Sequence, residues 1–290
     1  MNWKSEVEKI LTEFVGKQVT VDSFLSLSGG SINETYKVNT NEGDFFVKKN
    51  SISLYPNMFE KEADGLKILR DANEIDIPEI IDIGKSGDDS FLILKFINSG
   101  NKTSSFWNDF GKQLAKLHKH TNKQFGLNHD NYIGSLHQHN NTHNSWGEFF
   151  KEERLDRQVR LARNSGSIDR TIVTAFDRFY SKLDHIFPEE PPALLHGDLW
   201  GGNLMVNESG DPVIIDPAVY YGHREMDLGM SQLFGGFDVQ FYSSYHNNYP
   251  LESGWEERLN YCNLYPLMVH VNLFGGGYLQ SVNKTLKKFR

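Results

Sequence analysis

Asp198, Asn203 and Asp216 have the side-chain types and the spacing that phosphoryl transfer requires. Asn203 follows Asp198 by five residues, and Asp216 comes directly after the apolar pair Ile214-Ile215. In this chemistry one Asp accepts the proton of the attacking hydroxyl. The Asn and the second Asp hold the magnesium ion that bridges the phosphates of ATP. The pattern therefore predicts a phosphotransferase site.

Glycines flank these residues and supply the backbone freedom that a tight loop between two short strands needs; they are Gly197, Gly201 and Gly202. The alternative is an ordinary Asp/Asn/Gly turn in a β-hairpin. The second Asp, which ends its own apolar strand, argues against that alternative.

The composition limits the class of protein. The chain has 290 residues, a formal net charge of -8 and a single cysteine, Cys262. The negative charge argues against a nucleic-acid binder, and no apolar run is long enough to cross a membrane. One cysteine excludes an intrachain disulfide framework and is typical of a reducing compartment, so we expect a cytoplasmic protein.

The elements that must position the site fall into two groups. Residues 1–97 read as a β-rich, ATP-binding lobe, with expected helices at 3–15 and 57–72 and strands at 24–28, 35–39, 44–49, 80–84 and 91–97. The polar break Asn98-Ser99-Gly100-Asn101 separates them from a helical lobe, residues 98–290, that carries catalysis and substrate binding. Its expected helices lie at 105–119, 146–163, 168–186 and after 227, interrupted by a strand–loop–strand segment at 194–216. We therefore expect an α+β, protein-kinase-like fold of two lobes.

Nucleotide binding in such a fold needs a glycine turn over the phosphates, a lysine on the next strand and a helix carboxylate to orient it. Gly29 and Gly30 lie between the first two strands, where that turn is needed. Lys48 and Lys49 point to opposite faces of their strand, and periodicity does not choose between them. Glu62 is the candidate carboxylate, with Glu60 as the competing choice.

The sequence resembles the fructosamine kinase, or ketosamine-3-kinase, family across nearly its whole length. The matching segments include Gly29-Gly30-Ser31-Ile32-Asn33-Glu34, Phe46-Val47-Lys48, His196-Gly197-Asp198-Leu199-Trp200-Gly201-Gly202-Asn203 and Tyr220-Tyr221-Gly222-His223-Arg224-Glu225. The last two are the most specific, because the His-Gly-Asp core alone also occurs in aminoglycoside and choline kinases.

The resemblance implies ATP- and Mg²⁺-dependent phosphorylation of a sugar hydroxyl on a ketosamine, free or on a glycated lysine of a protein, and thus a deglycation role. It also implies Lys48 as the ATP lysine, Glu62 as its partner and Asp198 as the base. Asn203 and Asp216 would be the metal ligands. Trp200 would pack against the sugar, although a loop-anchoring role in the core is an equal alternative.

Three other functions are possible. An aminoglycoside- or choline-type phosphotransferase would share the fold and the metal site. A non-catalytic pseudokinase usually lacks the base, a metal ligand or the lysine, and none of these is missing here. A protein kinase needs an activation segment, but Asp216 and Asp227 are only eleven residues apart.

Other residues receive supporting roles. Asp227 is expected to hold the catalytic loop through backbone hydrogen bonds, and His196 to orient it. Histidines crowd residues 129–143, but their neighbours are Asn, Gln and Thr, so a solvated loop is favoured over a metal site. The sequence leaves the preferred sugar and amine, the oligomeric state and the role of this loop open.

Overall fold

The computed structural model describes residues 3–27 and 32–290. The chain divides into two compact units. The first contains residues up to Thr103 together with Met205–Asp216, and the second contains Ser104–Leu204 and Pro217–Arg290.

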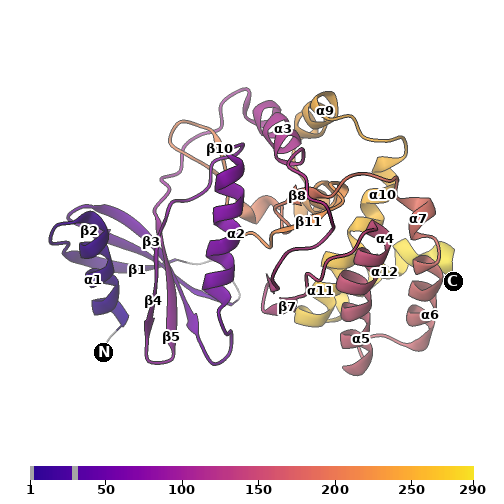
Figure 1. The fold of residues 1–290 in the computed structure, drawn as a ribbon, viewed down its shortest axis with the longest axis horizontal. Coiled ribbons are helices and arrows are strands. Elements are labelled where there is room, and N and C mark those ends of the chain that lie inside the picture. The colour runs from indigo at the N-terminus through magenta and orange to yellow at the C-terminus, as the bar shows by residue number, and fades with distance from the viewer. Residues whose placement is uncertain (1–2, 28–31) are drawn as a thin grey trace. The chain divides into compact units, whose positions relative to one another are not determined.

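The first unit is built on one antiparallel sheet of five strands in the order β1-β2-β3-β5-β4 (Figure 1). Two helices and a short hairpin complete it. Its elements are α1 (Trp3–Val15), β1 (Val21–Leu27), β2 (Glu34–Thr40), β3 (Gly43–Ser51), α2 (Met58–Ala72), β4 (Ile80–Ser86), β5 (Asp89–Lys95), most of β9 (Leu204–Val206) and β10 (Pro212–Ile214).

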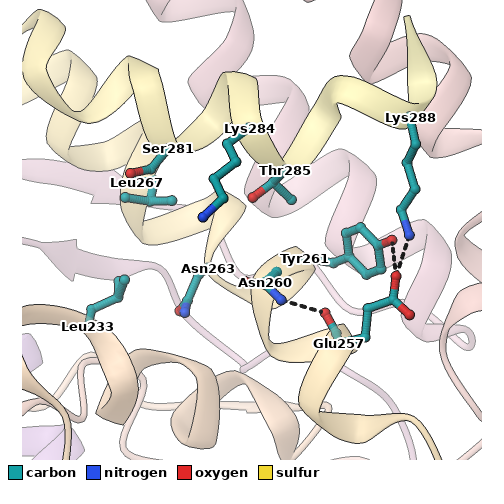
Figure 2. A pocket seen from close by; sticks show the side chains of 10 residues that line it. All are labelled: Leu233, Glu257, Asn260, Tyr261, Asn263, Leu267, Ser281, Lys284, Thr285 and Lys288. Carbon is teal, nitrogen blue, oxygen red and sulfur yellow. Dashed lines mark hydrogen bonds and ion pairs between the residues drawn. The ribbon is translucent and has the colours of Figure 1, made fainter.

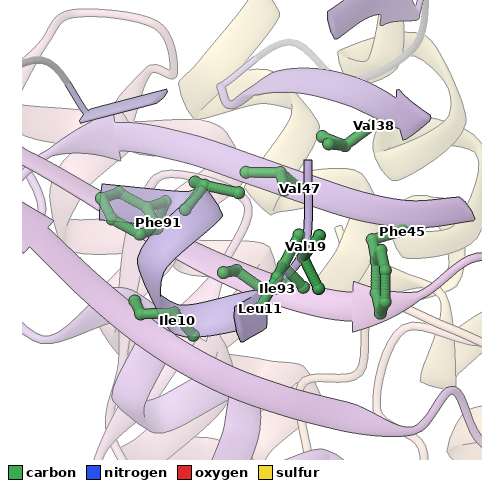
Figure 3. Packing of buried hydrophobic residues seen from close by; sticks show 9 residues of the cluster. Ile10, Leu11, Val19, Val38, Phe45, Val47, Phe91 and Ile93 are labelled. Carbon is green, nitrogen blue, oxygen red and sulfur yellow. The ribbon is translucent and has the colours of Figure 1, made fainter. Parts of the chain in front are cut away.

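The central strands of the sheet are apolar on both faces because a helix covers each face. On β3, Phe45 and Val47 join the core cluster that contains Ile10 and Leu11 of α1 (Figure 3). A second cluster lies on the opposite face of the sheet. It contains Phe59 and Leu66 of α2 with Leu92 and Leu94 of β5, and Phe46 of β3 packs against it. Successive side chains of a strand alternate between faces, so Lys48 shares the α2 face with Phe46.

The second unit is mostly helical (Figure 1). Phe110 of α3 packs on Phe241 of α9, with ring centroids 5.0 Å apart. Its α-helices are α3 (Phe106–Leu117), α4 (Trp146–Phe149), α5 (Asp156–Asn164), α6 (Arg170–Tyr180), α7 (Leu183–Ile186), α8 (Glu225–Gln232), α9 (Val239–Asn248), α10 (Trp255–Cys262), α11 (Leu264–Phe274) and α12 (Leu279–Thr285). Its short strands are β6 (Asn131–Ile133), β7 (Leu136–Gln138), β8 (Ala193–Leu195) and β11 (Tyr220–Gly222).

Two segments of the second unit differ from the sequence expectation. The helix expected at 146–163 contains a π-helical stretch, Phe150–Leu155, between α4 and α5. The histidine-rich loop expected at 129–143 contains a hairpin, in which β6 pairs with β7. Within the described part of the chain, no helix is both long and apolar enough to span a membrane.

Candidate active site

Lys48 is the centre of a buried charge cluster in the first unit. Its side chain is only 3% exposed, and its Nζ lies 2.6 Å from Glu62 Oε1 and 2.5 Å from Asp216 Oδ1. Glu62 comes from α2, which covers the face of the sheet that Lys48 shares. The structure therefore brings together three of the residues that the sequence singled out.

The competing residues lie elsewhere. Lys49 points to the other face of β3, where its Nζ lies 2.9 Å from Glu34 and 3.1 Å from Asp89. Glu60 forms an ion pair with Lys85, with 2.5 Å between the charged atoms. The fold therefore pairs Lys48 with Glu62, whereas Lys49 and Glu60 each pair with other residues.

The two carboxylates keep the buried ammonium charged. Burial by itself would lower the pKa of Lys48, but Asp216 and Glu62 outweigh it and raise the pKa above its ordinary value. Burial raises the pKa of Glu62, and the adjacent Lys48 opposes that change. An amine kept cationic in this way can bind an anionic group.

Asp216 adopts a left-handed backbone conformation, with φ of 55°, which a non-glycine residue rarely takes. Such a conformation costs on the order of 1–3 kcal/mol and persists where surrounding structure enforces it. Asp216 follows β10, and its side chain is 43% exposed although one oxygen contacts Lys48. The conformation aims a partly exposed carboxylate at the lysine.

A cavity of about 160 Å³ in the first unit adjoins this cluster. Its lining is mainly apolar and consists of Leu27, Phe46, Pro78, Leu94, Lys95, Phe96, Ile97, Ser99, Met205, Ile215 and Asp216. Phe46 and Asp216 connect the cavity to Lys48, because one shares its face of the strand and the other contacts its ammonium group. The cavity can accept a flat apolar group whose charged extension reaches the lysine.

The second unit holds Asp198 and Asn203 on one loop. Asn203 donates its Nδ2–H to the Asp198 carbonyl at 2.9 Å and to Asp198 Oδ2 at 3.0 Å. The side chain of Asn203 is buried within the 3₁₀ turn Gly201–Asn203. This contact fixes the orientation of the Asp198 carboxylate.

Asp227 of α8 holds the same loop through the loop's backbone N–H groups. Its Oδ2 accepts a hydrogen bond from the His196 N–H at 2.8 Å, and its Oδ1 accepts one from the Gly197 N–H at 2.9 Å. His196 Nδ1 in turn accepts the Asp198 N–H at 3.2 Å. The supporting roles expected of Asp227 and His196 are confirmed, and His118, with Nε2 3.2 Å from Asp227 Oδ2, extends the network.

Gly197 permits a close backbone approach in this loop. Its φ is 83°, and a Cβ atom there would lie 2.1 Å from the Ala218 carbonyl oxygen. The Ala218 N–H also donates to the His196 carbonyl at 2.9 Å. Segment 217–219 is therefore tied directly to the loop that carries Asp198.

Trp200 lies at one end of a run of aromatic rings. Its ring centroid is 5.6 Å from that of Phe234, which is 4.9 Å from His270 and 6.3 Å from Tyr278. Phe234 has φ of 56° and is 45% exposed, so an unusual backbone conformation presents its ring to solvent. The sequence reasoning missed Phe234 and His270, because only the fold brings Phe234 beside Trp200 and His270 beside Phe234.

A separate cavity of about 440 Å³ lies among the C-terminal helices (Figure 2). Glu257, Asn260 and Tyr261 of α10 face Lys284 and Thr285 of α12 across it. Its lining contains none of the residues that the sequence singled out. Gly29 and Gly30, the expected phosphate turn, lie outside the described residues.

Comparison with known proteins gives the family. The fructosamine kinase family model matches residues 3–290. A protein from Vibrio parahaemolyticus named a probable ketoamine kinase is 41% identical over 266 residues, which cover 90% of each chain. The chloroplastic protein-ribulosamine 3-kinase of Arabidopsis thaliana is 39% identical over 94% of this chain and 84% of its own length.

The chain belongs to the fructosamine kinase family. A crystal structure from Haemophilus somnus, described as a candidate fructosamine-3-kinase, has a TM-score of 0.89 and 31% identity, and covers 99% of this chain and 97% of its own. An aminoglycoside phosphotransferase structure, at a TM-score of 0.62 and 14% identity, shares the fold alone.

The fructosamine kinase assignment confirms the expected α+β, protein-kinase-like fold. It also confirms the expected class of activity, since the family consists of ATP-using phosphotransferases that act on a sugar hydroxyl.

Proposed function

We propose that this protein transfers the γ-phosphate of ATP to a sugar hydroxyl of a ketosamine, free or on a glycated lysine of a protein. The observation that carries the proposal is the loop in which Asn203 contacts the Asp198 carboxylate while Asp227 holds the preceding backbone at Gly197. Asp198 orients the acceptor hydroxyl and takes its proton. A positioned base of this kind contributes about 10²- to 10⁴-fold to the rate.

On the nucleotide side, Lys48 binds the phosphates of ATP and Glu62 orients it. Support comes from the 2.6 Å ion pair and from the raised pKa that keeps the amine charged. The apolar cavity beside Phe46 has the lining that an adenine ring requires. Gly29 and Gly30 are proposed to cover the phosphates through their backbone N–H groups.

Asn203 and Asp216 are the proposed magnesium ligands. An amide oxygen and a carboxylate form the hard donor set that Mg²⁺ prefers, and the exposed share of Asp216 leaves its carboxylate accessible. Asn203 uses its Nδ2 on Asp198, so its Oδ1 is the atom with which it would hold the ion. When bound, magnesium neutralises charge on the phosphates.

On the acceptor side, Trp200 is the proposed contact for the sugar. It follows Asp198 by two residues, and its ring belongs to the aromatic run with Phe234 and His270. An aromatic face suits the C–H surface of a sugar, and the partly exposed ring of Phe234 extends that face.

An assay of ATP consumption with magnesium tests the proposal. Ribulose-lysine and fructose-lysine are compared with kanamycin and choline, and Asp198→Asn is the control variant. We expect turnover on a ketosamine, reduced at least about 10²-fold by the substitution while ATP binding persists. Turnover on kanamycin or choline alone would contradict the acceptor, and full activity of Asp198→Asn would contradict the base.

A further inference from the structure

The hairpin of β6 and β7 places two histidines beside a carboxylate. Asn131 pairs with Gln138, and Tyr132 with His137. His137 lies in β7 and His139 directly follows it, and the centroids of their two rings are 4.3 Å apart. Asp130 precedes β6 and lies next to both of them.

The three side chains are close enough to share one ion. Asp130 Oδ2 lies 2.7 Å from His137 Nε2 and 3.3 Å from His139 Nδ1, and all three ligand atoms fall within 4.8 Å of one another. Zinc bonds of about 2.0–2.1 Å in a tetrahedral site place ligand atoms roughly 3.3 Å apart. Small side-chain rotations would bring the atoms to that spacing.

The carboxylate and the second histidine are held in place by other contacts. Asp130 Oδ1, the oxygen that faces away from the histidines, accepts the Asn140 N–H at 2.9 Å. The fully buried Arg154 donates to the His139 carbonyl and, at 2.7 Å, to Asn140 Oδ1. Outer contacts of this kind orient metal ligands in proteins.

The buried face of the hairpin adds further rigidity. Gln138 Nε2 donates to Asn131 Oδ1 at 2.9 Å and to the Ala218 carbonyl at 3.0 Å, and Asn131 Nδ2 donates to the Val219 carbonyl at 2.8 Å. The hairpin that carries His137 is therefore anchored by a buried hydrogen-bond network.

We propose that Asp130, His137 and His139 form a binding site for one divalent transition-metal ion of the zinc type. Two imidazole nitrogens and one carboxylate oxygen are the protein ligands. Water completes the coordination, because the side chain of His137 is 49% exposed. Nitrogen ligands select zinc-type ions over magnesium, so the site is chemically distinct from the oxygen ligands of phosphoryl transfer.

The test is a zinc titration of the full chain by isothermal calorimetry, with excess magnesium present to occupy oxygen-only sites. We expect one equivalent of zinc to bind. His137→Gln, His139→Gln and Asp130→Asn should each weaken binding at least tenfold. His185→Gln, which removes an exposed histidine outside the hairpin, is the matched control and should bind as the wild type does.

Cobalt substitution gives a second readout that does not depend on stability or activity. The wild type should show the visible absorption of tetrahedral Co²⁺, and His137→Gln should lose it. Equal zinc binding by the wild type and all three variants, or no stoichiometric binding by a folded wild type, would overturn the proposal and leave the three residues as a hydrogen-bonded surface cluster.

Discussion

At the scale of single residues, the Lys48–Glu62 ion pair differs from the Lys85–Glu60 ion pair, whose glutamate is on the same helix, in how deeply its lysine is buried. Glu62 contacts a lysine that is 3% exposed, whereas Glu60, two residues earlier, pairs with Lys85, whose side chain is 52% exposed. Buried charged hydrogen bonds contribute more than exposed pairs, which contribute little. The two glutamates of α2 should therefore differ strongly in their effect on activity.

We predict that Glu62→Gln lowers kcat/KM for ATP by about tenfold to hundredfold, because Lys48 loses one of its two carboxylates. Glu60→Gln, the matched control on the same helix, should leave kcat/KM within about twofold. Steady-state kinetics with ATP as the varied substrate measures both. Equal effects of the two substitutions on kcat/KM would contradict the proposed role of the Lys48–Glu62 ion pair in binding ATP.

Residue patterns alone left Lys48 and Lys49 equivalent for a physical reason. A strand covered by helices on both faces is apolar on both, so alternation carries no information about which lysine points to the nucleotide. The spacing of Asp198 and Asn203, by contrast, is local, and their contact could be foreseen. Phe234 and His270 lie far from Trp200 in sequence, and only tertiary structure joins them.

At the scale of elements, the loop after β8 depends on one close backbone approach. Gly197 has φ of 83° and no room for a Cβ atom against the Ala218 carbonyl, whereas a Cβ on Gly201 of the same loop would meet no atom within 4 Å. A Cβ atom is therefore excluded by contact at Gly197 but not at Gly201, so comparing the two positions distinguishes a steric requirement from a general need for a flexible loop.

We predict that Gly197→Ala destabilises the chain by at least about 2 kcal/mol, from the left-handed backbone and the steric clash, and lowers Tm by about 4–8 °C. Gly201→Ala should leave Tm within about 2 °C. Differential scanning calorimetry checks both variants. A Gly197→Ala protein as stable as the wild type would show that segment 217–219 can move away from the loop.

Long, periodic elements could be read from the sequence, and short ones could not. The helix expected at 3–15 is confirmed by α1, and the five strands of the first unit by β1–β5 with small shifts at their ends. The hairpin β6–β7 was not predicted from the sequence, because strands of three residues with Asn, His and Gln show no alternation of polarity. The buried amides of Asn131 and Gln138 stabilise it together with the buried Ile133.

At the scale of the whole molecule, stability must depend on pH through buried histidines. Burial lowers the pKa of His223 from 6.5 to about 4, with Glu190, Arg224 and Arg258 as the charged groups around it. Between these values the unfolded chain binds a proton that the folded chain does not. Stability therefore falls as pH decreases, by about 1.4 kcal/mol per unit from this residue.

We predict that the wild type loses about 1.5 kcal/mol more than His223→Gln when pH is lowered from 6.5 to 5. Urea unfolding at the two pH values measures the difference, and His185→Gln should behave as the wild type does. If the slopes of the wild type and His223→Gln agree, His223 accepts a proton in the folded state without cost.

The division of the chain has a consequence for synthesis on the ribosome. The first unit needs residues up to Thr103 and also Met205–Asp216, and Met205, Ile215 and Asp216 line its cavity. About a hundred residues of the second unit must be translated in between, so the cavity and the Lys48–Asp216 contact form only after roughly three quarters of the 290 residues exist. A nascent chain halted before Met205 lacks part of the cavity wall, so the growing chain acquires a complete cavity late in translation.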